Sequence, residues 1–508
     1  MKRVILPVAA VAAFALSASS FAVENNGAAS NAALASEVSQ LSAETKKLEH
    51  EVAVLKNKHT HKNKHHAVTA KKKTVPHDAL AEGQTGPASS SDYPWKHFVT
   101  VTTTPFLDKA PEYNGSDLLV NFPTMNQDLA LLKHRQAVVN QLAARGYHID
   151  RPILQLSGEV AGQLFSNGGF GTKATDGVSL SDAELDMNAI ASSWANAFMS
   201  MEYNGAPVST GNRAPNASIY LSRGFVTIGN LDVTPVYFTG GLMYVPYGSY
   251  NNSMVSTPLT QSMDRILSPT ALLGVSFANG LYGSAYGFSG SRTSGASAIL
   301  KQAGFNAGFK HTFATDGNYD FGAGWVSNVA DSQGQQNNGV ATTGGQFGGF
   351  AVSQPGTTVS NNNLVHNVGG FDVHGVVGKG PVSVIGEYLG ADERYSPLDL
   401  TYNSAGAMPR AMHAEVDYLL PWFAKKYGTT LGLSYGRTWQ SLALNLPQDK
   451  YAAFVNTSIW RETTESLEYN YQQDYATTAT ALGRGATTVI QGTGKHSNSV
   501  IAQFGVYF

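Results

Sequence analysis

Leu154-Gln155-Leu156-Ser157-Gly158-Glu159-Val160-Ala161-Gly162-Gln163-Leu164 is the stretch that decides the fold. Leucine, glycine and valine occupy every second position, and mainly polar residues occupy the positions between them. Because neighbouring side chains of a strand point to opposite faces, this pattern predicts a strand with one apolar and one polar face. Such a strand suits a transmembrane β-barrel, in which the apolar face meets lipid and the polar face lines the lumen.

Further segments of this kind, rich in aromatic residues and glycine, continue to the end of the chain. The strands are expected at 152–165, 178–190, 194–204, 216–230, 234–245, 269–278, 281–290, 300–313, 318–329, 364–378, 381–390, 410–420, 427–439, 450–459, 463–475 and 497–508. Their connections alternate between short and long, as do the periplasmic turns and outer loops of outer-membrane barrels. The predicted fold class is all-β, a transmembrane antiparallel β-barrel of about 16 strands, with about 14 or 18 as alternatives because strand edges are uncertain.

The first 22 residues read as an export signal. Lys2 and Arg3 precede an apolar run from Val4 to Leu16, and Ser20-Phe21-Ala22 is a small-x-small cleavage site. We therefore expect a signal peptide at 1–22. An uncleaved anchor helix is the alternative, but the apolar run is shorter than the roughly 18 residues that a spanning helix needs.

The last strand carries the complementary signal. Phe504, Val506 and Phe508 occupy its apolar positions up to the terminus, which resembles the signal that the barrel assembly machinery of bacteria recognises. Together with the export signal, this pattern predicts the bacterial outer membrane as location and outer-membrane lipid as surroundings, with the N-terminal segment in the periplasm.

The overall composition agrees with a membrane barrel. Of the 508 residues, 14% are charged and 42% are hydrophobic, yet no apolar run has the length of a spanning helix. Cysteine is absent, which excludes a lipid-modified cysteine, disulfides, thiolate metal sites and cysteine catalysis.

Residues 23–58 form a heptad segment. Leu34, Leu41, Leu48 and Leu55 recur every seven residues, with Val38, Thr45 and Val52 between them. This a/d seam predicts a coiled coil, and through it a homo-oligomer. A lone amphipathic helix on the barrel rim is the alternative, because three heptads are marginal for an isolated helix.

Residues 59–92 are expected to be a disordered linker rich in histidine and lysine. Between Lys56 and His77 the chain has seven lysines, five histidines and no acidic residue. A solvated basic run that touches anionic polymer or lipid explains this pattern. The histidines could instead bind a transition metal, but the lysines repel cations and no carboxylate completes a site, so no metal site is predicted.

Residues 93–150 form a small segment before the barrel, which is assigned to 151–508. A short β-prone run covers Phe98 to Thr102. A helix is expected at 125–145, with Leu129, Leu132, Val139 and Leu142 on one face and Gly146 as its stop. This segment could be a periplasmic subdomain or a short plug.

Strand parity predicts which polar side chains face the lumen. In a barrel of 16 strands the interior is wide enough for an aqueous channel. The expected pore-lining residues are Glu159, Asp182, Glu184, Asp186, Asn196, Glu202, Lys310, Asp372, His374, Glu387, His413, Glu415, Asp417 and Glu468. From Arg151 onward there are 18 Lys and Arg against 23 Asp and Glu, a net charge of minus five. Such an excess of acids favours cations in a pore.

Two long connections are candidates for a role in the pore. The third outer loop, 246–268, is long enough to fold inward and narrow the lumen, as third loops of porins do, and Asp264 and Arg265 are its candidate constriction residues. The fifth, 330–363, is rich in Gly, Gln, Asn, Ser and Thr, and reads as a flexible surface loop or a ligand cap.

An enzyme is not predicted. His413, Glu415 and Asp417 share one face of a strand, which could orient the histidine as a base. No nucleophile is identifiable nearby, and the sequence has no Gly-x-Ser-x-Gly elbow. We therefore assign no catalytic residue, no cofactor and no nucleic-acid partner.

The sequence resembles the LbtU family of siderophore porins. The resemblance rests on the signal, the heptad segment, the basic linker and the passage from Asp150 to Val160, together with Tyr244-Val245-Pro246-Tyr247-Gly248, which looks like the Pro-aromatic-Gly step of phosphate-selective-type porins. It implies import of a ferric siderophore without a large plug domain. The residues themselves leave two other functions open: a general or cation-preferring diffusion porin, and a structural barrel that tethers the envelope.

Overall fold

The computed structural model describes residues 99–101, 125–144, 146, 152–204, 218–290, 300–313, 317–337, 345–351, 364–420, 429–460 and 463–507. The chain divides into two compact units, Met1–Ala81 and Glu82–Phe508, and every described residue belongs to the second. The predicted signal peptide, heptad segment and histidine-rich linker lie outside the described residues, and so does Phe508 of the assembly signal.

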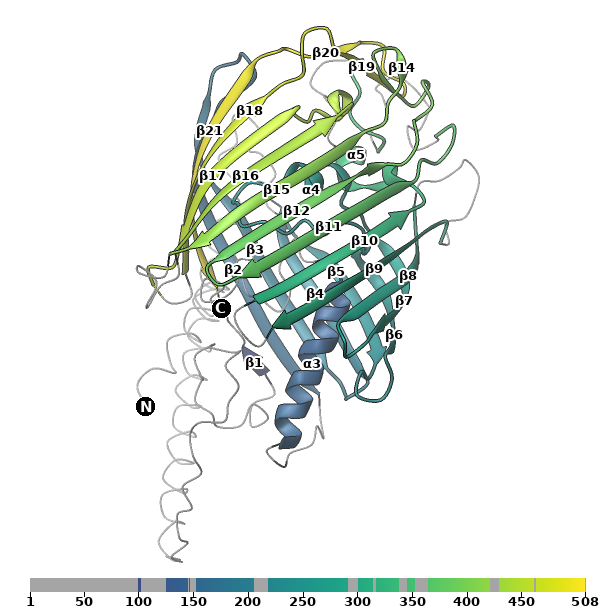
Figure 1. Cartoon of the computed structure of the whole chain (residues 1–508), viewed down its shortest axis with the longest axis vertical. Coiled ribbons are helices and arrows are strands. Elements are labelled where there is room, and N and C mark those ends of the chain that lie inside the picture. The colour runs from purple at the N-terminus through teal and green to yellow at the C-terminus, as the bar shows by residue number, and fades with distance from the viewer. Residues whose placement is uncertain are drawn as a thin grey trace, which may run out of the picture. The chain divides into compact units, whose positions relative to one another are not determined.

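Sixteen antiparallel strands close into a barrel (Figure 1). They are β2 Ile153–Asn167, β3 Thr175–Ile190, β4 Ala195–Asn204, β5 Ser218–Gly229, β6 Val236–Tyr244, β7 Leu267–Ser276, β8 Leu281–Phe288, β9 Gln302–Phe313, β10 Gly317–Val326, β11 Gly370–Lys379, β12 Val382–Ala391, β15 Arg410–Leu419, β16 Thr429–Trp439, β17 Asp449–Thr457, β18 Thr463–Gln473 and β21 His496–Tyr507. The first and last pair through Gly162 and Phe504, which completes the ring. The predicted fold class is confirmed.

The sequence places each of these strands, and the largest difference is at the start of β11. This strand begins at Gly370, not at residue 364. The residues before Gly370 belong to a loop and not to the strand. Val365 N donates to Asp399 Oδ2, and Val368 is buried in the main core. A further short strand, β1 Val99–Val101, lies parallel to β2 at Leu154 to Leu156, where β2 extends beyond its pairing with β21.

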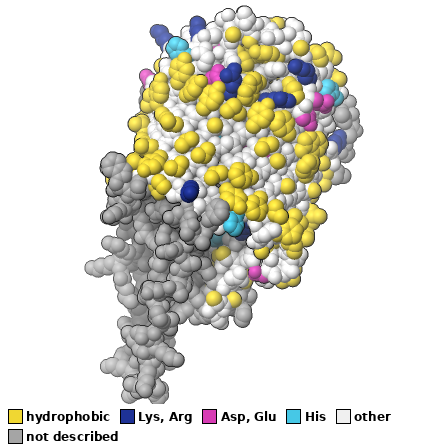
Figure 2. All heavy atoms as spheres, viewed as in Figure 1, with side chains coloured by type: hydrophobic (Ala, Val, Ile, Leu, Met, Phe, Trp, Pro, Cys, Tyr) yellow, Lys and Arg dark blue, Asp and Glu magenta, His cyan; other side chains and the backbone are white. Residues whose placement is uncertain are grey.

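The outward face of the barrel is apolar. Val226, Leu273, Phe305, Leu433 and Phe504 expose between 43% and 67% of their surface, and Figure 2 shows hydrophobic side chains spread over this side of the barrel. A continuous exposed surface of this kind is stable in contact with lipid. Among the described residues no helix is long and apolar enough to cross a membrane, a finding that concerns helices alone.

Aromatic rings gather near both rims of the outward face. Near the short turn between β9 and β10, Phe309, His311, Tyr319 and Phe321 form a chain of ring contacts at 5.5 to 6.2 Å. At the opposite rim, where the long loops begin, Tyr388 contacts Phe371 and Trp439. Such girdles mark the two interfaces between bilayer and water.

The long loops fold into a cap at their rim. It contains a four-stranded sheet of β13 Leu400–Tyr402, β14 Ala405–Gly406, β19 Thr480–Gly483 and β20 Ile490–Gln491, with η2 Val329–Asp331, α5 Gln333–Asn337 and η3 Leu442–Leu444. Phe347, Phe350 and Tyr395 pack their rings together in its core. Sequence patterns predict only loops here, because strands of two to four residues are too short to show a period.

Candidate functional site: the lumen and its inward loop

The third long loop lies inside the barrel. It leaves β6 at Tyr244, contains the short helix α4 Leu259–Asp264, and returns to β7 at Leu267. The side chains of Tyr247 and Tyr250 are fully buried, and the Tyr247 hydroxyl donates to the carbonyl of Phe371 across the lumen at 3.1 Å. Helix α4 packs against β12, β15 and β16.

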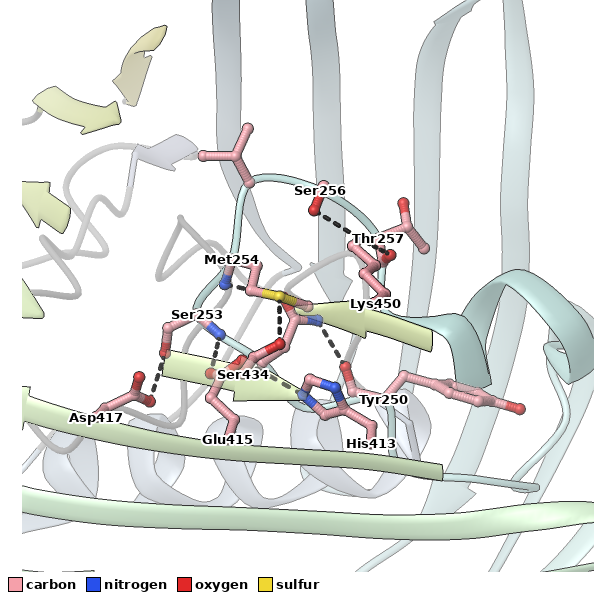
Figure 3. A network of polar contacts seen from close by, with 12 residues as sticks. Tyr250, Ser253, Met254, Ser256, Thr257, His413, Glu415, Asp417, Ser434 and Lys450 are labelled. Atoms are coloured by element: carbon pink, nitrogen blue, oxygen red, sulfur yellow. Dashed lines mark hydrogen bonds and ion pairs between the residues drawn. The ribbon is translucent and has the colours of Figure 1, made fainter. Parts of the chain in front are cut away.

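Carboxylates of the wall hold this loop by its backbone. Glu387 Oε1 on β12 accepts hydrogen bonds from the N–H groups of Ser249 at 2.6 Å and Tyr250 at 3.2 Å. On β15, Glu415 Oε1 accepts from Ser253 N at 2.6 Å. Figure 3 shows Ser253 between Glu415 and Asp417, whose Oδ2 accepts from the Ser253 hydroxyl at 3.0 Å.

The next turn of the loop is held on β17 and β18. Glu468 Oε2 accepts hydrogen bonds from Val255 N at 2.5 Å and Ser256 N at 3.0 Å. Lys450 Nζ donates to Ser256 Oγ at 2.7 Å and to the carbonyl of Thr257 at 2.9 Å. The loop has no strand partner there, so these side chains satisfy backbone groups that burial would otherwise leave unpaired.

This arrangement changes the role of several residues that sequence analysis assigns to the pore. Glu387, Glu415, Asp417 and Glu468 face the lumen as strand parity requires, but their oxygens are used by the loop. His413 is buried beside them, with Nε2 at 3.3 Å from Glu415 Oε2. Strand parity shows which side chains face the lumen, but it does not show where the backbone of the loop lies. The hydrogen bonds between that backbone and these carboxylates therefore could not be predicted.

Asp264 and Arg265 lie at the end of α4. Asp264 is fully buried and accepts a hydrogen bond from Gln335 Nε2 at 2.7 Å. Burial raises the pKa of the Asp264 carboxyl to about 7. The Arg265 guanidinium lies 4.3 Å from the centre of the Tyr244 ring. The two side chains thus fasten the inward loop to its surroundings.

A second set of acids occupies the wall formed by β2 to β5. One ligand atom each of Glu159, Asp182 and Glu184 lies within 4.8 Å of the others. Arg223 is fully buried beside them and pairs with Glu184, with Glu202 at 3.3 Å and with Asp186 at 3.9 Å. Among the described residues of β2 to β5, acids outnumber arginine on the inward face.

Sequence analysis misses Arg223. Its inward position depends on a β-bulge between β4 and β5, where Ser200 pairs with Arg223 but Met201 pairs with Leu221. Strict alternation from the exposed Ile219 and Leu221 would place Arg223 outward. The one sequence signal for the bulge is a lone arginine in an apolar strand that neighbours strands rich in acids.

The remaining predicted residues occupy other parts of the wall. His374 Nδ1 lies 2.8 Å from Asp372 Oδ2, and Lys310 Nζ lies 3.5 Å from Asp320 Oδ2. Asn196 on β4 accepts a hydrogen bond from Arg135 Nη1 at 3.1 Å. That arginine belongs to a helix, which therefore reaches the lumen.

The helix α3 Gln127–Ala144 enters the barrel from the rim with the short turns (Figure 1). Its N-terminal half is buried on several sides, with Leu129, Leu131 and Leu132 in one cluster with lumenal side chains such as Phe198 and Phe225. Asn306 Nδ2 on β9 donates to Asn126 Oδ1 at 2.8 Å, just before the helix. The C-terminal Ala143 and Ala144 are exposed. The predicted helix is confirmed.

A closed ring of sixteen strands, an apolar outward face and an inward third loop define a class: this is a porin-like β-barrel of the outer-membrane type. The chain is 36% identical over 416 residues to a UPF0422 protein of Legionella pneumophila (strain Lens), which covers 80% of this chain and 76% of the relative. A UPF0422 protein of Coxiella burnetii is 31% identical over 418 residues, 81% of this chain and 84% of the relative. The chain therefore belongs to the UPF0422 family.

Solved structures with a similar fold are more distant. An anion-selective porin from Comamonas acidovorans has a TM-score of 0.47 at 9% identity, over 70% of this chain and 100% of that one. OprB of Pseudomonas putida has a TM-score of 0.43 at 11% identity, over 70% of this chain and 94% of that one. No family model matches the chain.

Proposed function

We propose that the protein is an outer-membrane channel for small solutes that prefers cations. The observation that carries this proposal is the third loop, which carboxylates on β12, β15 and β18 fix inside the closed barrel. A loop held at this depth narrows the lumen and sets the size of the solute that passes. Its side chains and the facing wall then determine the charge of that solute.

The preference for cations follows from the wall of β2 to β5. The loop engages the acids of the opposite wall. On the wall of β2 to β5, Glu184, Asp186 and Glu202 share Arg223, and Glu159 and Asp182 lie beside Glu184. A low-dielectric wall focuses the field of such a cluster into the lumen. Cations are attracted there and anions are repelled.

Helix α3 acts in this proposal as a plug at the periplasmic rim. It occupies the lumen with buried leucines and a buried arginine, so solutes cross this end only beside the helix or when it moves. In this proposal the helix Gln127–Ala144, which is the part of the segment 93–150 that enters the barrel, acts as a short plug.

A planar-bilayer measurement tests the proposal. The purified protein is placed between unequal concentrations of potassium chloride, and the reversal potential is recorded. We expect the sign of the reversal potential to show that potassium passes faster than chloride. The double variant Asp182→Asn with Glu159→Gln should reduce this preference, while Lys379→Gln, at the short-turn end of β11, should leave it unchanged. An anion-selective channel or the absence of conductance would overturn the proposal.

Import of a ferric siderophore rests on the resemblance to the LbtU family alone. The described lumen adds no contact in its favour, and the acidic wall would repel an anionic ferric complex. Uptake of radiolabelled ferric siderophore by cells with and without the protein separates this function from general diffusion. The homo-oligomer through Leu34, Leu41, Leu48 and Leu55 stays a prediction, as does an envelope tether by that segment.

A further inference from the structure

Three arginines lie at the rim with the long loops, two of them on outward-facing strand positions. Arg410 begins β15, Arg437 lies on β16, and Arg394 lies in the connection between β12 and β15. Arg410 is paired across the strands with Trp439, two positions from Arg437. Figure 2 shows Lys and Arg side chains near this rim, surrounded by hydrophobic side chains.

Arg410 and Arg437 lie at the depth of the aromatic girdle. The Arg410 guanidinium is 5.5 Å from the centre of the Phe371 ring, and that of Arg437 is 5.7 Å from the Trp439 ring. Tyr388 joins these rings, at 5.5 Å from Phe371 and 5.9 Å from Trp439. Because aromatic girdles lie at the level of lipid headgroups, the guanidinium groups of Arg410 and Arg437 lie at that level too.

Most of the charge of this cluster is not neutralised by the protein. Arg410 donates to neutral groups, the carbonyl of Ala391 and the Tyr388 hydroxyl at 3.3 Å each and Met408 Sδ at 3.4 Å. Arg394 donates to the carbonyl of Gly406 at 2.8 Å and to Gln440 Oε1 at 3.3 Å. Among the described residues neither has a carboxylate within 4.0 Å.

Acids are present nearby but are partly engaged. Arg437 Nη1 lies 3.4 Å from Asp449 Oδ1, which also accepts from the Tyr435 hydroxyl at 2.7 Å. Asp392, which precedes Arg394 in the same connection, accepts from Trp325 Nε1 at 2.8 Å. Gln440 Oε1 accepts from both Arg394 and the backbone N–H of Met408. Met408 Sδ in turn accepts from Arg410, so Gln440 links the neighbourhoods of the two arginines.

We propose that Arg394, Arg410 and Arg437 bind the phosphate groups of a phosphorylated glycolipid, lipopolysaccharide, in the outer leaflet of the membrane. The guanidinium group presents paired donors that match phosphate oxygens. At headgroup depth an unneutralised arginine meets lipid phosphate in place of bulk water, which strengthens the attraction. The assignment to the outer leaflet rests on the proposed outer-membrane location, in which long loops face outward.

Lipid binding to the full-length protein in detergent tests this site. The probes are diphosphorylated lipid A and the same lipid after removal of both phosphates, and bound lipid is counted by native mass spectrometry. We expect wild-type protein to retain the phosphorylated lipid at least about tenfold more tightly, as befits charge-assisted hydrogen bonds. The double variant Arg394→Gln with Arg410→Gln should lose most of this difference.

Lys379→Gln is the matched control, because it removes a charge from the exposed short-turn end of β11. It should retain the wild-type preference. Equal loss in both variants, or equal binding of the two lipids by wild-type protein, would overturn the proposal. Complete displacement of the lipid by inorganic phosphate would overturn it too, because it would show a site for the free anion. If the double variant does not fold, the binding of phosphorylated and dephosphorylated lipid A by wild-type protein still tests the proposal. Bilayer conductance of the folded double variant should be unchanged, which separates this site from the channel.

Discussion

Glu415 on β15 accepts a hydrogen bond from the backbone N–H of Ser253 at 2.6 Å, although 162 residues separate them. A charged acceptor on the barrel wall thereby replaces the strand partner that an inward loop lacks. The relationship shows why an acidic lumen does not by itself report selectivity. Some of its acids are structural anchors of the loop, and these do not act on a solute.

Removing the Glu415 anchor should loosen the inward loop. Glu415→Ala leaves the buried Ser253 N–H without an acceptor, which costs about 1 to 3 kcal/mol. We expect a larger and noisier single-channel conductance in planar bilayers. Glu415→Gln keeps an oxygen at the same place and should remain close to wild type. Identical traces for the alanine variant and wild type would show that this contact does not position the loop.

Asp264 should make the barrel more stable in mildly acidic than in alkaline solution. Burial raises its pKa in the folded protein from 3.8 to about 7, so the folded state binds a proton that the unfolded state releases. This contribution to stability is complete below the unfolded pKa and falls, by up to about 4 kcal/mol, as pH rises through the folded value. Melting temperatures at pH 5 and pH 8 measure the effect.

The control for Asp264 is Asp264→Asn, which has the same shape and no titrating proton. The variant should show a smaller decrease in melting temperature between pH 5 and pH 8 than wild type. An equal decrease in the two proteins would assign the pH dependence to other groups.

Weakening the packing of α3 should open the rim with the short turns. Leu132 is fully buried among lumenal side chains, so Leu132→Asp would place a charge in an apolar site and expel the N-terminal half of the helix. We expect higher conductance and faster proteolysis of the helix. Asn140→Ala changes an exposed position of the same helix and serves as control. Unchanged conductance in the Leu132 variant would exclude a plug.

Loss of Arg223 should destabilise the barrel strongly. Arg223→Gln leaves Glu184, Asp186 and Glu202 buried together without their cation. Breaking a buried ion pair from one side costs about 3 to 5 kcal/mol. The expected result is a lower melting temperature and a poorer yield of folded barrel on gel mobility assays. Restoring stability by the added change Glu184→Gln would confirm charge repulsion as the cause.

The barrel could be predicted because its strands obey a local rule. Alternation like that from Leu154 to Leu164 recurs along the spanning segments, and the alternation of short and long connections fixes their order. The inward orientation of Glu159, Glu387 and Glu415 follows from the same parity. Each of these features depends on neighbours in the chain or on the lipid, so the sequence alone determines it.

Contacts between distant segments were decided only by the tertiary structure. Parity shows that Glu415 faces inward, but not that Ser253 takes its oxygen. The apolar face of α3 predicts a buried helix, but not that Leu131 on another side is buried as well, inside the lumen. The bulge that turns Arg223 inward breaks the alternation itself. Backbone groups of loops, bulges and inserted helices carry no periodic signal, so their partners are fixed only when the closed barrel brings them together.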